Sequence, residues 1–158
     1  MKRQVLALGV AVLVIGLLAG GGAPAKAMSV EAGWYGSTGF NLGAYMGMGE
    51  NMEVGASVST SFLTLGGGVE GRYLLSPFKL EFLPGAFQPY AFGRADVATT
   101  VGVFDLYAFG GVGARYALTD KLSIWESLGV GPRFLKTTWG DLHTGLRFIT
   151  GGGFRYDF

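Results

Sequence analysis

The chain has 158 residues, of which 49% are hydrophobic and 15% are charged, and its net charge is +1. The absence of cysteine excludes a disulfide framework and thiol catalysis, and a single histidine is too little for a typical metal site. Lys2, Arg3 and Lys26 account for the positive balance, because the residues after position 27 carry nine Lys+Arg and eleven Asp+Glu, a net charge of −2. We therefore predict no nucleic-acid partner, no metal and no cofactor.

The first 27 residues have the pattern of a secretory signal peptide. Lys2 and Arg3 precede an apolar run from Val5 to Leu18, and small residues follow as far as Ala27. A membrane-anchor helix is the alternative, but the run of about 14 residues is shorter than the ~20 that such a helix needs. We predict cleavage after Ala27, which leaves one domain over residues 28–158.

This domain divides into eight segments in which apolar side chains alternate with polar or small ones. Alternation with a period of two is typical of strands, and the turn residues between segments favour an antiparallel meander. We predict an all-β fold, an eight-stranded antiparallel up-and-down transmembrane β-barrel, with both mature termini on the periplasmic side. The expected strands are about Ser29–Gly36, Phe40–Met48, Met52–Thr60, Leu63–Leu75, Gln88–Thr99, Phe104–Leu118, Leu122–Arg133 and Leu142–Phe158.

Two segments fit this scheme poorly. Ser76–Phe87 contains two prolines and is interpreted as an irregular turn rather than a strand. In the seventh strand, turning Glu126 toward the interior also turns Ile124, Leu128 and Val130 inward. Either a bulge shifts the register there, or the barrel has an apolar patch inside.

The last strand ends in alternating residues, with Phe154, Tyr156 and Phe158 on one face and Gly153, Arg155 and Asp157 on the other. A membrane barrel turns such an aromatic face to lipid and the charges inward. Gly153, Tyr156 and Phe158 also match, in spacing, the C-terminal assembly signal of bacterial outer-membrane barrels, which this strand resembles. That resemblance implies the outer-membrane barrel assembly machinery as a partner.

Three similar repeats end in Arg-Tyr, at Tyr73, Tyr116 and Tyr156. Their spacing predicts a girdle of tyrosines at the periplasmic membrane interface, with an ordinary protein core as the alternative. On these repeats the chain resembles the small eight-stranded bacterial outer-membrane barrels of the OmpA/OmpX type. The resemblance implies a cell-envelope protein of a Gram-negative-type bacterium, porin-like in architecture and monomeric, surrounded by outer-membrane lipid and lipopolysaccharide.

Charged residues of interior parity are the first candidates for a functional site. An eight-stranded barrel is only wide enough for side chains to fill it, so these groups must pair with one another. We predict a salt-bridge network that plugs the lumen, with an ion path as the alternative. Its proposed members are Glu53, Glu70, Arg72, Arg94, Asp96, Arg115, Arg147, Arg155 and Asp157.

His143 is the one residue that suggests catalysis, with Thr144, Glu126 and Asp141 as possible partners. Lipid A deacylases, which belong to the small barrels, pair their histidine with a serine two residues further on, where this chain has Gly145. We therefore interpret His143 as a rim residue and expect no enzyme, although a lipid A-modifying activity stays a third option.

The expected function is that of an integral outer-membrane protein with a structural or lipid-interacting role. Trp139, Lys136 and Arg133 are candidates for contact with lipopolysaccharide headgroups. The leading alternative is binding or passage of a small hydrophobic ligand through a partly apolar interior, lined by Ile124, Leu128, Val130, Phe92 and Phe109. A soluble periplasmic barrel is the main alternative for the fold.

Overall fold

The computed structural model describes residues 28–36, 39–61, 63–137, 140 and 142–158. The predicted signal peptide, Trp139 and Asp141 lie outside these residues. The strands are β1 (Met28–Tyr35), β2 (Gly39–Gly47), β3 (Met52–Thr60), β4 (Leu65–Leu74), β5 (Phe78–Lys79), β6 (Ala86–Thr100), β7 (Val103–Ala117), β8 (Leu122–Thr137) and β9 (Leu142–Asp157). No helix in this part of the chain is long and apolar enough to cross a membrane.

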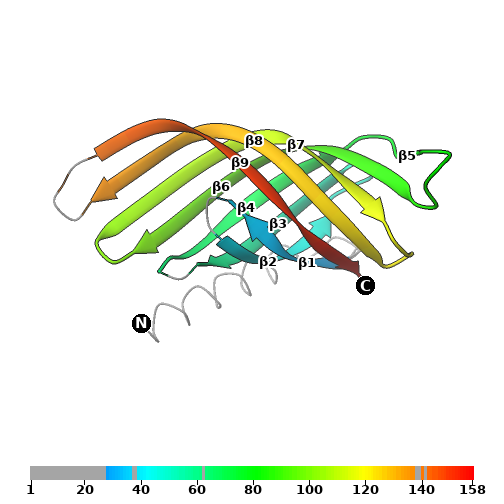
Figure 1. Cartoon of the computed structure of the whole chain (residues 1–158), viewed down its shortest axis with the longest axis horizontal. Coiled ribbons are helices and arrows are strands. Elements are labelled where there is room, and N and C mark those ends of the chain that lie inside the picture. Colours follow the sequence, from blue (N-terminus) through cyan, green and yellow to red (C-terminus); the bar gives the residue numbers. More distant parts are fainter. Residues whose placement is uncertain (1–27, 37–38, 62, 138–139, 141) are drawn as a thin grey trace.

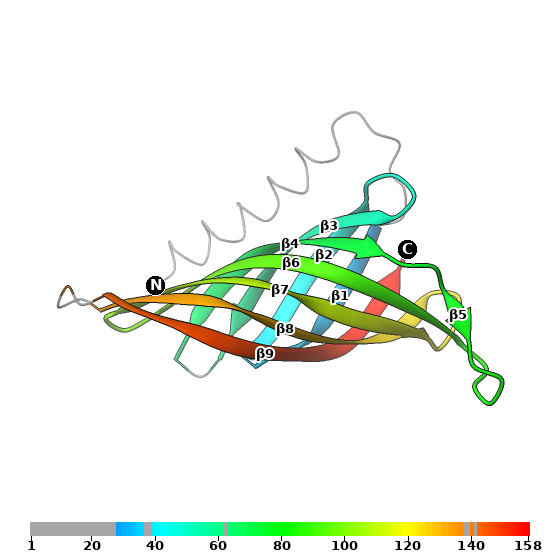
Figure 2. The same cartoon turned by 90° about the horizontal axis from the view of Figure 1, so that it is seen from above.

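The strands form one closed barrel in which every pairing is antiparallel (Figures 1 and 2). The order runs β4-β3-β2-β1-β9-β8-β7-β6, and the β4–β6 pairing closes the ring. β5 pairs only with β6, beside the ring. The prediction of an eight-stranded antiparallel barrel is therefore confirmed. The prediction of an irregular turn at Ser76–Phe87 is wrong in part, because Phe78–Lys79 pairs with Ala86–Phe87 as a short hairpin.

The strand registers also determine how far the wall is staggered. One row of partners runs from Trp34 through successive strands to Leu142 of β9. Trp34 itself pairs with Gly152, ten residues further along β9. A closed sheet with such a stagger requires strands tilted by roughly 40° to the barrel axis.

Strand length divides the wall into a short half and a long half. β1 to β4 have 8 to 10 residues each, whereas β6 to β9 have 15 or 16. Both ends of the described domain meet at one end of the barrel, where the Phe158 amide donates to the Met28 carbonyl at 3.0 Å. The long strands extend the wall at the opposite end (Figure 1).

Large interior aromatic side chains lie directly opposite glycines on the neighbouring strand. A Cβ at Gly55 would lie 2.2 Å from the Tyr45 ring, and one at Gly113 would lie 2.3 Å from Tyr90. Glycine at these positions makes room for the ring inside a narrow barrel. The other pairs of this kind are Tyr35–Gly151 and Phe92–Gly111, whereas the Trp125 ring would lie 2.9 Å from a Cβ at Gly33.

β8 resolves the difficulty at Glu126, and both predicted alternatives are wrong. The registers of β8 with β7 and with β9 are the same before and after Glu126, so no bulge is present. Ile124, Leu128 and Val130 are 37%, 54% and 39% exposed, so they point outward and form no interior patch. Glu126 points outward with them, while Ser123, Trp125 and Ser127 face the interior.

Candidate functional site

The interior of the barrel contains one continuous chain of ion pairs. It runs from Asp96 through Arg94, Glu70, Arg72, Glu31 and Arg155 to Glu53 and Arg115, and Asp157 branches from Arg155. We call these nine residues the interior network. Eight of the nine predicted residues belong to it. Arg147 does not belong to it. It lies eight residues before Arg155 on β9, in the part that extends the long half of the wall, and it is exposed there.

Arg72 occupies the centre of the interior network. Its guanidinium meets both carboxylate oxygens of Glu31, with 2.8 Å between Nη2 and Oε2, and its Nε donates to Glu70. The rings of Tyr45 and Tyr90 lie 4.1 and 4.8 Å from the guanidinium carbon. Arg72 is 1% exposed, so these groups take the place of water around its charge.

Arg94 carries the network toward the middle of β6. Its Nε donates to Asp96 at 2.6 Å, and Nη1 donates to Glu70 at 3.0 Å. Nη2 donates to the Ser57 hydroxyl at 2.9 Å, and the Tyr35 ring lies 4.2 Å from the guanidinium carbon. The prediction that Glu70 and Arg72 face Arg94 and Asp96 across neighbouring strands matches this geometry.

Arg155 links Glu31 to Glu53 near the end of the barrel where the termini meet. It binds both oxygens of Glu53 at 2.9 Å, donates to Glu31 at 3.2 Å, and donates to Asp157 at 2.8 Å. Arg115 Nη2 lies 3.1 Å from Glu53 without the alignment of a hydrogen bond. Bidentate contacts such as that between Arg155 and Glu53 are the strongest that arginine makes with a carboxylate.

The charges of the interior network nearly balance. Arg72, Arg94, Arg115 and Arg155 are each at most 8% exposed, and so are four of the carboxylates, those of Glu31, Glu53, Glu70 and Asp96. Asp157, at the rim, adds the fifth negative charge. Buried charges persist where each has an opposite partner and aligned donors, which is the arrangement here.

Glu31 is the member that the sequence reasoning missed. It contacts both Arg72 and Arg155, and it is 1% exposed. Its parity on the first strand, opposite to that of Val30 and Ala32, already pointed inward and was the available signal.

The aromatic residues of the predicted girdle lie at one end of the barrel. Tyr73, Tyr116 and Tyr156 are each the last residue but one of β4, β7 and β9. Tyr73 and Tyr156 are 51% and 43% exposed, whereas the Tyr116 hydroxyl accepts a hydrogen bond from the Gly85 amide and its ring packs on Phe87. Tyr156 meets Phe158 edge to face at 5.2 Å.

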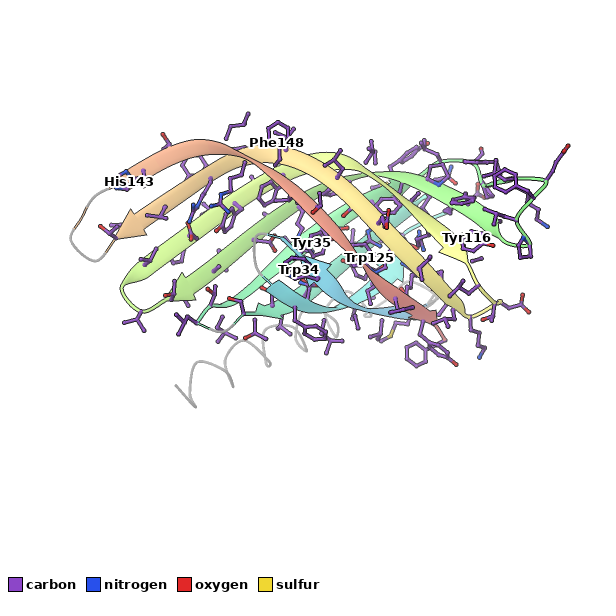
Figure 3. The ribbon with its side chains drawn as sticks, viewed as in Figure 1. Trp34, Tyr35, Tyr116, Trp125, His143 and Phe148 are labelled. Carbon is purple, nitrogen blue, oxygen red and sulfur yellow. The ribbon has the colours of Figure 1, made fainter. Side chains whose placement is uncertain are left out.

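His143 lies far from Glu126, one of the groups considered as its partners. It is the second residue of β9, at the far end of the long half, away from Tyr35 and Trp125 (Figure 3). It pairs with Leu135, whereas Glu126 pairs with Gly152, so about 30 Å of strand separates them. Within the described residues, no group of His, Cys, Asp and Glu side chains has the arrangement of a metal site.

Two residues of the predicted headgroup site, Arg133 and Lys136, have opposite parity on β8. Arg133 has interior parity, and its Nε and Nη2 donate to Asp105 at 2.8 Å, whereas its contact with headgroups stays a prediction. Lys136 has the opposite parity and points outward.

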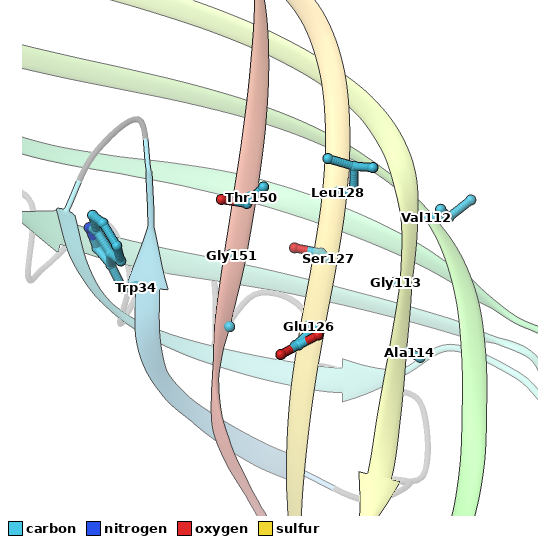
Figure 4. Close-up of a pocket in the computed structure, with 10 residues that line it drawn as sticks. Trp34, Val112, Gly113, Ala114, Glu126, Ser127, Leu128, Thr150 and Gly151 are labelled. Carbon is cyan, nitrogen blue, oxygen red and sulfur yellow. The ribbon is translucent and has the colours of Figure 1, made fainter.

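A hollow opens on the outside of the wall where β1, β9, β8 and β7 pass one another (Figure 4). It has a volume of about 670 Å³ and is lined by Trp34, Glu126, Leu128, Thr150, Gly152, Val112 and their neighbours. We call it the Glu126 hollow. It lies outside the barrel, separate from the interior network.

No protein-family model matches the chain, and no curated protein matches it. Among solved structures, its fold is similar to that of a major outer membrane protein from Thermus thermophilus. The two chains are 18% identical with a TM-score of 0.46, over 85% of this chain and 100% of that chain. Membership of the OmpA/OmpX-type family stays a prediction.

Proposed function

We propose that the chain is an integral bacterial outer-membrane β-barrel protein with a structural or lipid-interacting role. Its lumen is filled by side chains, it has no open aqueous pore, and it is not an enzyme. One observation supports this most strongly: the polarity of the barrel is inverted. Arg94 and Glu31 are 3% and 1% exposed inside, while Phe40 and Phe154 are 55% and 58% exposed outside.

Inverted polarity is unfavourable in water and favourable in lipid. A soluble barrel would expose its apolar outer face at a cost of roughly 25 cal/mol for each Å². In a bilayer the same face meets hydrocarbon, and closure of the barrel pairs the backbone groups that water would otherwise satisfy. This argument favours the membrane barrel over the soluble periplasmic barrel.

Strand length supports a transmembrane orientation. The 8 to 10 residues of β1 to β4 are close to the ~9–11 that a tilted strand needs to cross a bilayer. β6 to β9 exceed this length and would project beyond the outer surface. Both mature termini would then lie in the periplasm, with Tyr73 and Tyr156 at the periplasmic interface of the outer membrane.

The interior network supports a closed lumen. Ion-paired side chains from β1, β3, β4, β6, β7 and β9 meet inside a ring of eight strands, which is only wide enough for side chains to fill. The hydrophobic-ligand alternative loses support, because Ile124, Leu128 and Val130 of its proposed lining face outward. The lipid A-modifying alternative loses support because His143 lies far from Glu126.

Three measurements test the proposal, two on the purified protein and one on isolated membranes. An unheated sample in dodecyl sulfate should migrate differently from a boiled one, and the protein should remain with membranes after a carbonate wash. In planar bilayers it should give no reproducible conductance steps. Solubility without detergent would refute the membrane placement, and stable channel steps would refute the closed lumen.

A further inference from the structure

Glu126 is a charged residue on a surface that is otherwise almost uncharged. Across the eight strands of the described barrel, the outward positions carry one other charged residue, Lys136, the last residue but one of β8. Glu126 instead lies between Ile124 and Leu128 on the outward face of β8. If the outer wall faces lipid, this carboxylate lies in the hydrocarbon belt.

The neighbours of Glu126 leave space around the carboxylate. Its cross-strand partners are Ala114 on β7 and Gly152 on β9, and Gly152 in turn pairs with Trp34. A Cβ at position 152 would lie 3.6 Å from Glu126 Cγ, so the side chain passes close to the bare glycine. The Glu126 hollow therefore results from two small residues on either side of an acid (Figure 4).

Among the described residues, no positive charge on the outer wall lies near Glu126, because Arg115, beside its partner Ala114, points inward to Glu53. Lys121 lies five residues before it along the chain, or about 16 Å, and Lys136 lies ten residues beyond it, or about 33 Å. Among the described residues, the Glu126 carboxylate has no ion pair or hydrogen bond. A carboxylate in hydrocarbon is unfavourable without a partner, and no described residue supplies one, so a cationic ligand would stabilise it.

The shape and chemistry of the hollow indicate what that counterpart is. A volume of about 670 Å³ falls within the range of small-molecule sites, ~300–1,000 Å³. Trp34, Leu128 and Val112 offer apolar contact, and Glu126 and Thr150 offer hydrogen-bond acceptors. A hydrocarbon chain bearing one cationic donor satisfies both parts at once.

We propose that the Glu126 hollow binds the ammonium group of an amphiphile dissolved in the membrane. The ammonium N–H groups donate to the Glu126 carboxylate, and the hydrocarbon portion lies along Trp34, Leu128 and Val112. A free long-chain amine and an aminophospholipid share this chemistry. The inference rests on the proposed membrane placement of the outer wall.

Quenching of Trp34 by brominated amphiphiles tests the inference. Trp34 is 63% exposed and Trp125 is 1% exposed, so a Trp139→Phe background leaves Trp34 as the lipid-exposed reporter among the described tryptophans. The folded protein in non-ionic micelles is titrated with a brominated octadecylamine and with the matching alcohol. The amine should half-quench at a concentration about tenfold lower, as expected of a charge-assisted hydrogen bond.

Three variants make the result specific. Glu126→Gln should remove the preference for the amine, and Gly152→Leu should fill the hollow and weaken quenching by the amine. Gly71→Leu is the matched control, because Gly71 also points outward and a Cβ there meets nothing within 4 Å. Brominated phosphatidylethanolamine, compared with brominated phosphatidylglycerol, shows whether an aminophospholipid is the source.

Equal quenching by amine and alcohol, or an amine preference that survives Glu126→Gln, would overturn the inference. In either case the membrane placement would stand, because both probes quench Trp34. Absence of quenching by every brominated probe would instead contradict the placement of Trp34 in lipid, and with it the proposed function.

Discussion

Arg72 of β4 and Glu31 of β1 form a bidentate ion pair across the barrel interior, although β2 and β3 lie between their strands in the wall. Each is 1% exposed, and each has a further charged partner, Glu70 for Arg72 and Arg155 for Glu31. The pair therefore connects separate parts of the wall through the lumen. Its loss should be felt across the whole barrel.

Glu31→Ala should lower the free energy of unfolding by about 3–5 kcal/mol, because it leaves the buried charges of Arg72 and Arg155 short of a partner. Urea unfolding in lipid vesicles, followed by tryptophan fluorescence, measures the change. The double variant with Arg72→Leu should cost less than the sum of the single variants, with a coupling of roughly 0.5–3 kcal/mol. Simple additivity would contradict a direct interaction between the two residues.

Gly55→Ala should destabilise the barrel by about 1–3 kcal/mol, since the new methyl group overlaps the Tyr45 ring. Gly71 lies on the outward face, where an added Cβ meets nothing within 4 Å. Gly71→Ala should therefore leave the free energy of unfolding unchanged or raise it by up to about 1 kcal/mol. The same unfolding assay compares the two. Equal effects would mean that the interior is not packed around its glycines.

Much of this arrangement follows from the sequence. Strict alternation predicted Met52–Thr60 as a strand with the bounds of β3, and it assigned Arg94 and Asp96 to the interior. Alternation failed at Glu126, because the reasoning turned the charge inward although three apolar neighbours of the same parity favoured the outside. Local pattern alone also does not reveal which charges meet. Glu31 and Arg72 are 41 residues apart, and their contact depends on the stagger with which the sheet closes.

Phe158→Ala should reduce the amount of protein assembled into the outer membrane of cells while changing the unfolding free energy of the refolded protein little. Phe158 is 69% exposed and contacts Tyr156 edge to face, so it contributes little to packing but belongs to the proposed assembly signal. Phe148→Ala is the control, since Phe148 is 75% exposed on β9, the strand that ends just before Phe158. Quantitative immunoblotting of membrane fractions compares them, and equal yields would argue against an assembly role for Phe158.

The native chain has no cysteine, so single cysteines report orientation without background. Thr144→Cys, on the projecting part of β9, should react with a membrane-impermeant maleimide in intact cells. Asp120→Cys, in the turn between β7 and β8 at the opposite end, should react only after the outer membrane is permeabilised. The reverse pattern would place the termini outside the cell.

Collision of a nitroxide spin label with oxygen and with a water-soluble nickel complex tests most directly whether the outer wall faces lipid. The labels are placed singly by Leu42→Cys, Val69→Cys and Leu106→Cys, three outward positions that are 46%, 50% and 39% exposed on β2, β4 and β7. In vesicles, each label should collide readily with oxygen and rarely with nickel, unlike a label at Asp120→Cys. Ready collision with nickel at all three positions would show that the apolar wall faces water and would contradict the membrane barrel.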